Sequence, residues 1–376
     1  MFTRRANLLA AALGLFFSGC SFWSHIAHDA VEYNRTVERS NNQILLLNIL
    51  RAKERLPMYF TTLSLIRGSL SSTLGAGAEA TVGGGVNDAK LTPRAEYKSS
   101  PSFDVAVLDS HEFMRGILAP VSLETVRYYW DQGWPADLLL HLFVREIRLR
   151  DPATGVVTTY ENEPGGGYPE FRSLLYQLLD ENLRIAERKS LAGFGPSVPG
   201  KQASQLSTQL GVAGAGLQLV QDPQTGRYFL RRPAKDLVFV RDLPLPFAGA
   251  PVTLPLTDPY DQVVLRSPQG ILYYLGEIAR EQLMGEPNAV LLKGGIPLFV
   301  VRRNDSRAKT PAHVALDFMG LTYYIPAKAD ADHVDLDRDP GRSMQSLSLL
   351  AQLLALHKSA KDLPTTLPVT LVGGGP

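Results

Sequence analysis

The chain has 376 residues, with 38 lysines and arginines against 37 aspartates and glutamates, and 45% of its residues are hydrophobic. This composition excludes a chain that is disordered throughout, and its charge balance gives no reason to expect a nucleic acid as partner. Cys20 is the only cysteine, so we expect neither disulfide bonds nor a thiolate metal site in the folded part.

The first 19 residues have the three parts of a lipoprotein signal peptide. Two arginines at positions 4 and 5 are followed by an apolar stretch from Leu8 to Phe17, and the small residues Ser18 and Gly19 precede Cys20. An apolar stretch of about ten residues is too short to cross a bilayer as a helix and is typical of a cleaved signal. We therefore predict that the signal is removed and that Cys20 is lipidated. The alternative is an ordinary secretory signal with a cysteine there by chance.

A lipidated Cys20 would fasten the protein to a lipid bilayer, because each buried methylene of an acyl chain contributes about 0.8 kcal/mol and several chains anchor stably. In enterobacterial sorting, an aspartate directly after the cysteine tends to retain a lipoprotein at the inner membrane, whereas Ser21 permits export. The expected location is therefore the outer membrane of a bacterial cell envelope, with the folded part facing the periplasm.

The segment 20–66 is expected to be mainly helical. An apolar pattern starts near Val31 and continues from Ile44 to Leu50, with an interruption at Asn41-Asn42 and an end at Pro57. Beyond the signal, the chain contains no apolar run of about 18 residues, so no further membrane helix is expected.

Residues 67–108 show the most regular pattern in the chain, an alternation of apolar and polar positions. A period of two over this length predicts β-strands, and the glycines at 83–85 with Asn87-Asp88 predict the turn of a hairpin. Pro93 and Pro101 each remove a backbone donor, so the second strand is expected to be an edge or to be broken in places. The apolar positions expected to face a membrane or a partner are Leu70, Leu74, Val82, Tyr97, Phe103 and Val105.

The remainder of the chain is predicted to alternate helices with antiparallel strands. The apolar spacing predicts helices over 111–130, 169–189, 268–283 and 342–358, and strands over 138–150, 237–240 and 313–325. These patterns favour an α+β fold with N-terminal helices, a long β-hairpin, and then antiparallel sheets packed with helices. The predicted organisation is 1–19 signal peptide, 20–66 helical segment, 67–108 hairpin, 109–192 α+β unit, 193–216 linker or loop, and 217–376 one or more α+β units.

Motifs for catalysis or metal binding are not found along the sequence. His111-Glu112 lacks the second histidine of a helical zinc motif, because position 115 is arginine, and no Gly-Lys-Ser/Thr follows a glycine-rich stretch. The acidic residues from Asp330 to Asp339 are read as a solvated loop rather than a calcium site, because their spacing is not that of an EF-hand. We therefore expect no cofactor, no metal and no enzymatic activity.

Each strand of the expected hairpin is longer than the about 9–11 residues of a transmembrane β-strand. A single hairpin cannot cross a bilayer alone, because its edges would expose unpaired amides to lipid. Several copies could cross if their hairpins closed into one ring, which would make the protein a subunit of a pore. A hairpin packed in water on its own domain, or an arm that binds a partner, explains the same alternation.

Several short stretches, spread over most of the chain after the signal, carry a resemblance to a known protein family. They are Glu32-Tyr33-Asn34-Arg35, Leu45-Leu46-Leu47-Asn48-Ile49, Arg51-Ala52, Pro57-Met58-Tyr59-Phe60, Arg266-Ser267-Pro268-Gln269-Gly270, Tyr273-Tyr274-Leu275-Gly276-Glu277, Arg342-Ser343-Met344-Gln345 and the segment from Lys358 to Pro364. Together they resemble an uncharacterised family of proteobacterial lipoproteins. The resemblance implies a bacterial envelope protein and nothing catalytic. The helical polar residues Asn48, Arg51, Gln269 and Arg342 fit a buried network, a contact with a neighbouring subunit, or ordinary caps and surface positions.

The leading interpretation is an outer-membrane lipoprotein without enzymatic activity that assembles with itself or with an envelope protein complex. The alternatives are a periplasmic enzyme and a monomeric periplasmic binding module. An enzyme would show a deep pocket with convergent titratable groups, and the particle mass would separate rings from monomers.

Overall fold

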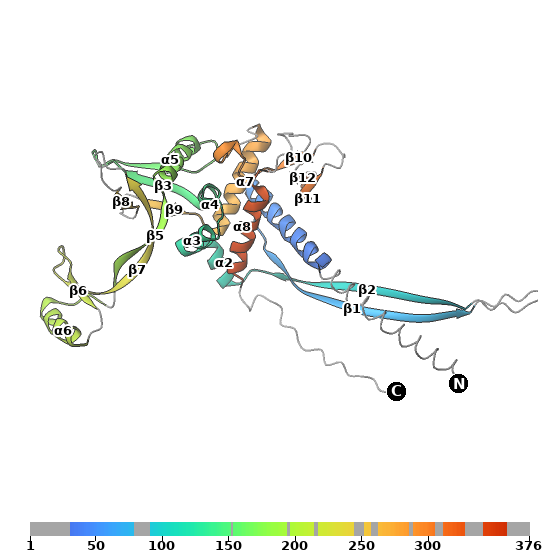
Figure 1. Ribbon diagram of the computed structural model, residues 1–376, viewed down its shortest axis with the longest axis horizontal. Coiled ribbons are helices and arrows are strands. Elements are labelled where there is room, and N and C mark those ends of the chain that lie inside the picture. The colour runs from blue at the N-terminus through green and yellow to red at the C-terminus, as the bar shows by residue number, and fades with distance from the viewer. Residues whose placement is uncertain are drawn as a thin grey trace, which may run out of the picture. The chain divides into compact units, whose positions relative to one another are not determined.

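The computed structural model describes residues 31–78, 91–151, 153–193, 196–213, 217–243, 252–256, 262–285, 289–304, 311–327 and 341–358. Its elements, labelled in Figure 1, form two compact units. Unit 1 comprises Met1–Leu118, Val301–Asp339 and Leu347–Pro376, and unit 2 comprises Ala119–Val300 and Pro340–Ser346. Both mix helices with antiparallel strands, so the predicted α+β class is confirmed. Neither unit is continuous in sequence, whereas the predicted ranges 109–192 and 217–376 each are.

A helix over residues 31–53 belongs to unit 1. It continues through Asn41 and Asn42, where the sequence predicts an interruption. The helix propensity of asparagine is only about 0.7 kcal/mol poorer than that of alanine. Burial of Leu46 and Ile49 on the same helix stabilises it by more than this amount, at roughly 1.5–3 kcal/mol per side chain.

Two antiparallel sheets also belong to unit 1. The first consists of β1 (Thr61–Ala78) and β2 (Leu91–Val107) and is the predicted hairpin. The second has the strand order β10-β12-β11, with β10 at Arg302–Asn304, β12 at Leu321–Pro326 and β11 at Ala312–Phe318. The short helix α2 (His111–Leu118) and the part of α8 (Ser343–Leu356) from Leu347 onward complete the unit.

The predicted strand 313–325 is in fact two strands, β11 and β12. They are joined by Met319 and Gly320, whose φ angles are 52° and 80°. Two successive residues with positive φ form the type I′ turn that hairpins prefer. The sequence pattern did not reveal this turn because methionine rarely adopts a positive φ.

Unit 2 contains a sheet in which β3 (Val144–Arg150) lies between β4 (Val157–Glu161) and β9 (Gln262–Leu265). Four helices of this unit are α3 (Leu123–Asp131), α4 (Ala136–Phe143), α5 (Tyr168–Asp180) and α7 (Pro268–Met284). The predicted helix at 268 is confirmed. Ser267 caps it, because its hydroxyl oxygen accepts a hydrogen bond from the Gly270 amide at 3.0 Å.

Three of the predicted elements have other boundaries in the structure. The range 111–130 contains two helices, α2 and α3, and the second begins after Ser122, whose hydroxyl accepts from the Thr125 amide. The range 138–150 begins as α4. All six residues from Leu138 to Phe143 are buried, His141 among them, so no exposed polar position marks a helical period in the sequence. The range 169–189 is α5 followed by the strand β5, with Asn182 at φ 57° between them.

A second sheet of unit 2 extends into an arm. β7 (Tyr228–Leu243) pairs with β5 (Arg184–Gly193), with β6 (Gln218–Gln221) and with β8 (Val252–Pro255). Within the range 193–216, for which the sequence predicts a linker or loop, lies the helix α6 (Gly200–Ala213). Its composition favours a loop, but α6 lies against β6 and buries Ala203, so tertiary contact stabilises it.

Gly341 occupies a position in unit 2 that tolerates no side chain. Its φ is +55°, and a Cβ added there would lie 2.3 Å from the Pro297 carbonyl oxygen. We expect Gly341→Ala to lower the free energy of unfolding by about 2–4 kcal/mol, because positive-φ strain of about 1–3 kcal/mol adds to this clash. Urea denaturation measures the change.

The matched control for Gly341 is Gly226, with φ +63° and nothing within 4 Å of an added Cβ. Gly226→Ala should cost only the backbone strain, about 1 kcal/mol. Equal losses in the two variants would show that the Pro297 carbonyl does not constrain position 341.

Candidate functional site

The hairpin of β1 and β2 is the candidate functional site. Its register runs from Thr61 opposite Val107 to Ala78 opposite Leu91. Strands of 18 and 17 residues extend about 55–60 Å at roughly 3.3 Å per residue. This length exceeds the hydrocarbon core of a bilayer, which is about 30 Å thick. In Figure 1 the two strands run side by side away from α2 and α8 of their unit.

The register pairs the apolar positions of one strand with those of the other. Leu74 is opposite Ala95, and Ala78 is opposite Leu91. Cross-strand partners lie on the same side of a sheet, so the two runs of apolar positions predicted from the sequence share one side of the hairpin.

A β-bulge between Leu63 and Leu65 extends this arrangement toward the base of the hairpin. On one side of the bulge Leu63 is opposite Val105, and on the other side Ile66 is opposite Phe103. A regular strand would place positions 63 and 66 on opposite sides, because side chains alternate with a period of two. The extra residue of the bulge therefore brings both apolar pairs to one side.

Both edges of the hairpin are unpaired in the part of the chain that the structure describes, since β1 and β2 pair with each other and with no third strand there. Half of the backbone N–H and C=O groups of each strand point away from its partner. A row of such groups is a template for pairing with another strand. An isolated two-stranded hairpin is also only marginally stable in water.

The base of the hairpin is held firmly by unit 1. The Leu108 amide donates to the Phe60 carbonyl at 2.8 Å, and the rings of Phe60 and Phe113 meet edge to face at 5.4 Å. Lys358 donates to the Thr62 hydroxyl at 3.1 Å. Partial burial lowers the pKa of Lys358, since the charged ammonium loses contact with water.

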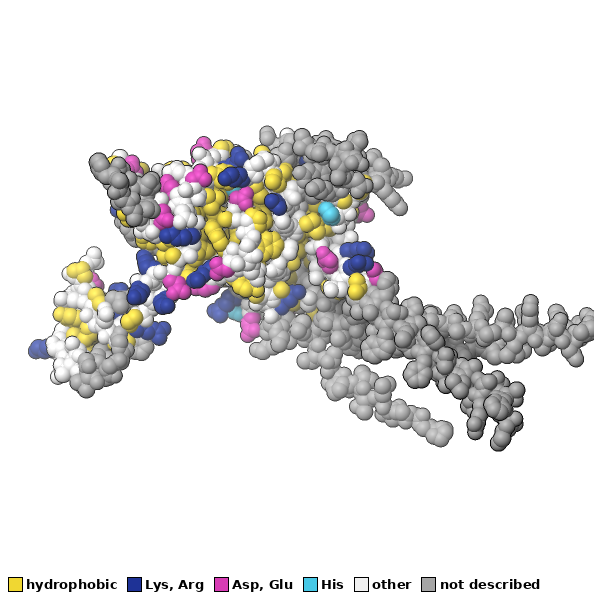
Figure 2. Space-filling view, in the orientation of Figure 1, with side chains coloured by type: hydrophobic (Ala, Val, Ile, Leu, Met, Phe, Trp, Pro, Cys, Tyr) yellow, Lys and Arg dark blue, Asp and Glu magenta, His cyan; other side chains and the backbone are white. Residues whose placement is uncertain are grey.

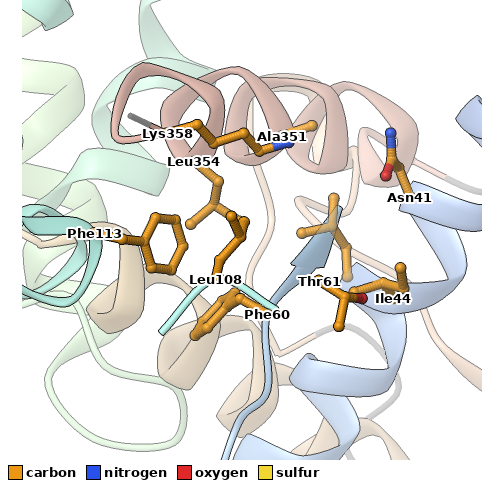
Figure 3. Close-up of a pocket in the computed structure, with 10 residues that line it drawn as sticks. Asn41, Ile44, Phe60, Thr61, Leu108, Phe113, Ala351, Leu354 and Lys358 are labelled. Atoms are coloured by element: carbon orange, nitrogen blue, oxygen red, sulfur yellow. The ribbon is translucent and has the colours of Figure 1, made fainter. Parts of the chain in front are cut away.

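A small cavity of about 60 Å³ lies at this base, between side chains of the helix 31–53, α2 and α8 (Figure 3). Phe60, Leu108, Phe113 and Leu354 point into it, with Lys358 at its rim. Pockets that bind small molecules measure about 300–1,000 Å³, so this cavity has room only for a few water molecules. It is a packing gap that accompanies the hairpin base and is too small for a substrate.

The predicted site residues fall partly in the described chain. Leu70 and Leu74 lie in β1, and Tyr97, Phe103 and Val105 lie in β2. Val82, Cys20 with its signal, and the acidic segment 330–339 lie outside the described residues, so lipidation stays a prediction. Sequence reasoning missed the base residues Phe60, Leu108, Phe113 and Lys358, because only the fold brings them together.

The four polar residues that the sequence predicts within helices have different surroundings in the structure. The Asn48 amide donates to the Tyr59 carbonyl at 2.8 Å while its oxygen accepts from the Tyr59 amide at 3.1 Å, so fully buried Asn48 is part of a network. Arg51 lies over the ring of Tyr59 at 5.1 Å. Arg342 lies in the turn before α8 and not within the helix, and its guanidinium donates to the Gln345 side chain at 2.9 Å. Gln269 is half-buried in the first turn of α7.

Unit 2 contains a buried polar cluster around Arg266, whose guanidinium lies 3.6 Å from the ring centre of Tyr274. Arg266 donates to the carbonyls of Val144 and Asn162, and the Asn162 amide donates to the carbonyls of His141 and Val144 at 2.8 and 2.7 Å. Because α4 leads directly into β3, its last carbonyls lack helical partners. The cluster supplies these partners and is structural.

His141 is the one buried histidine among the described residues. Its Nδ1 donates to the Asp137 carbonyl at 2.7 Å, and its ring lies about 6 Å from the rings of Tyr168, Phe171 and Tyr176. Burial lowers the pKa of His141 to about 4, because the charged imidazolium would be desolvated. The imidazole is therefore neutral at pH 7.

In the described part of the chain, no group of three or more His, Cys, Asp and Glu side chains is placed to hold a metal ion. Across the same residues, no helix combines the length and the apolar character needed to cross a membrane.

Comparison with known proteins gives no independent assignment. The family models contain no match to this chain, and searches of curated proteins and of solved structures also return no match.

Proposed function

We propose that this protein is a lipid-anchored subunit of the bacterial outer membrane that assembles with copies of itself through the β1–β2 hairpin. The observation that carries the proposal is a hairpin of about 55 Å whose two edges are unpaired among the described residues. Such edges are unfavourable in a free monomer and are removed when strands of neighbouring copies add to one sheet.

A second copy is the simplest partner, because every copy presents the same two different edges. Joining the β1 edge of one copy to the β2 edge of the next is a head-to-tail contact, which closes into a ring when the rotation allows. Pro93 and Pro101 remove two donors from β2, at a cost of roughly 1 kcal/mol for each lost hydrogen bond. The many remaining donors and acceptors along both strands outweigh this loss.

Lipidation of Cys20 and the resemblance to proteobacterial lipoproteins support a place at the outer membrane, with the folded units in the periplasm. An acyl anchor confines all copies to one surface and thereby raises their effective concentration. The apolar side of the hairpin fits lipid or the apolar side of another hairpin.

The experiment shortens the hairpin without touching its base. Ser69 is opposite Ser100, so replacing residues 70–99 by Asn-Gly leaves a short hairpin in register. We expect the full chain in detergent to form particles of several copies, and the shortened variant to be a monomer with an unchanged unit 1. Mass photometry measures both. A wild-type monomer would reject the proposal in favour of a monomeric enzyme or binding module. Oligomers that survive the shortening would reject the hairpin as the surface through which the copies assemble.

A pair of matched variants tests whether the apolar side enters lipid. Leu74→Asp with Val105→Asp should abolish insertion into liposomes, since charged substitutions on the lipid-facing side of a strand are destabilising in the hydrocarbon core. Ser71→Asp with Ser102→Asp places the same charges on positions of the predicted polar side and should leave insertion intact. Protease protection of the hairpin in liposomes is the readout. Equal protection in both variants would show that the apolar side of the hairpin does not face lipid.

A further inference from the structure

Strand β4 lies at one end of the β4-β3-β9 sheet of unit 2, and no described strand pairs with its outer edge. Its register with β3 runs without a bulge from Glu146 opposite Glu161 to Arg150 opposite Val157. Residues 157–159 are exposed. β4 is thus an edge strand whose backbone another strand can reach.

Hydrogen bonds at the two ends of β4 show which of its backbone groups face outward. The Asn162 amide donates to the Arg145 carbonyl at 2.9 Å, and the Asp151 amide donates to the Val156 carbonyl at 2.9 Å. Even-numbered residues of β4 therefore turn their N–H and C=O groups to β3, because these groups alternate along an antiparallel strand. Residues 157, 159 and 161 turn theirs outward, and no described residue hydrogen-bonds to them there.

A groove of about 210 Å³ follows this outer edge. Residues 158–161 of β4 line it together with Gly167 and Glu170 at the start of α5. The start of α5 lies on the outward side of β4, since a Cβ added to Gly167 would be 3.6 Å from the Glu161 carbonyl oxygen. An open strand edge is where extended peptides add as a further strand, and a groove beside it receives their side chains.

Both charged side chains of the groove are carboxylates, those of Glu161 and Glu170. Both residues are exposed, and neither carboxylate is in an ion pair with any described residue. Two arginines of β3, Arg145 and Arg148, pair instead with the buried Glu146. Figure 2 shows acidic side chains, in magenta, on the surface around α5. The groove is therefore complementary to a segment that carries positive charge.

We infer that β4 accepts an extended, lysine- or arginine-bearing segment of another protein as a further strand of this sheet. The outward groups of residues 157, 159 and 161 hold its backbone, and Glu161 and Glu170 pair with its cations. A second copy of this chain fits less well, because pairing β4 with β4 would bring the same carboxylates together. The groove lies within unit 2, so its use does not depend on assembly through β1 and β2.

The probe is a fluorescein-labelled peptide of alternating threonine and lysine, nine residues long, added to the full chain in detergent. We expect saturable binding in fluorescence anisotropy, because the peptide offers strand-forming backbone and cations on one side. The matched peptide has glutamate in place of each lysine and should not bind.

Thr159→Pro tests the backbone pairing. The Thr159 N–H faces away from β3, so proline at this position removes an outward donor and breaks no hydrogen bond of the sheet. We expect peptide binding at least about tenfold weaker, because one donor is lost and the ring occupies the place of the added strand. Thr159→Val keeps the donor and should bind as wild type does. Circular dichroism and thermal unfolding establish that both variants are folded.

Glu161→Gln with Glu170→Gln tests the charge. Binding should weaken by up to about fivefold for each carboxylate, and the remaining binding should depend less on salt. The matched control is Glu124→Gln, which should change nothing. Like Glu170, Glu124 is an exposed glutamate in the first turn of a helix of unit 2, in this case α3.

Four results would overturn the inference: no saturable binding, equal affinity for the glutamate peptide, unchanged binding by Thr159→Pro, or unchanged binding by the double glutamine variant. A smaller particle mass of Thr159→Pro without peptide would also overturn it, since a second copy would then occupy the edge. If the peptide binds through β4 while the full chain is a monomer in detergent, the groove inference stands and the proposed assembly through the hairpin falls.

Discussion

Arg266→Ala is expected to lower the free energy of unfolding of unit 2 by about 3–5 kcal/mol, as truncation of a buried hydrogen-bonded charge does. Arg266 is 4% exposed. Its guanidinium donates hydrogen bonds to the carbonyls of Val144 and Asn162 and stacks on the ring of Tyr274. Alanine would leave the Asn162 carbonyl without this donor and open a cavity against the Tyr274 ring. Urea denaturation followed by tryptophan fluorescence measures the loss.

The matched control for Arg266 is Arg145, whose side chain is 51% exposed and pairs with Glu146 at 3.0 Å. Arg145→Ala should cost only about 1 kcal/mol, because the buried Glu146 carboxylate keeps its second ion pair, with Arg148. Arg266→Lys should recover only part of the stability, because an ammonium cannot stack flat on a ring while donating to two carbonyls. Equal losses for Arg266→Ala and Arg145→Ala would show that the cluster does not stabilise the junction of α4 and β3.

Acidification from pH 6.5 to about 4 is expected to destabilise the protein through His141. The pKa of His141 is near 6.5 in the unfolded chain and is lowered to about 4 in the folded state by burial. In this window the unfolded state binds a proton that the folded state does not, so stability falls with falling pH and levels off below about 4. The full effect is about 3 kcal/mol, at roughly 1.4 kcal/mol per pKa unit.

His141→Phe should remove this part of the pH dependence, because phenylalanine fits among Tyr168, Phe171 and Tyr176 and cannot bind a proton. The charged groups that act on His141 are Asp137, Arg172 and Arg266, and the variant retains all three. The difference between wild type and variant in urea midpoints at pH 7, 5.5 and 4 isolates the histidine. His313→Gln, at an exposed position of β11, should leave the pH dependence of stability unchanged. If the stability of His141→Phe still fell with pH over this range, the pH dependence would have to come from other groups.

The hairpin and the helix α7 were predictable because each has a local signal. Alternation over Arg67–Val107 identifies strands whatever the rest of the chain does, and Ser267 before Pro268 marks a helix start by hydrogen-bonding chemistry. The helix α4 was not predictable in this way. It is buried on all sides, so the contrast between apolar and polar positions that reveals a period is absent.

The sequence by itself determined the α+β class, the long hairpin and the absence of recognisable catalytic motifs, since these depend on patterns among neighbouring residues. Only the tertiary structure decided which distant residues meet. It placed Arg266 against the end of α4 and built the hairpin base from Phe60, Leu108 and Lys358. These contacts join positions 48 to 296 residues apart, and no local pattern encodes such pairings.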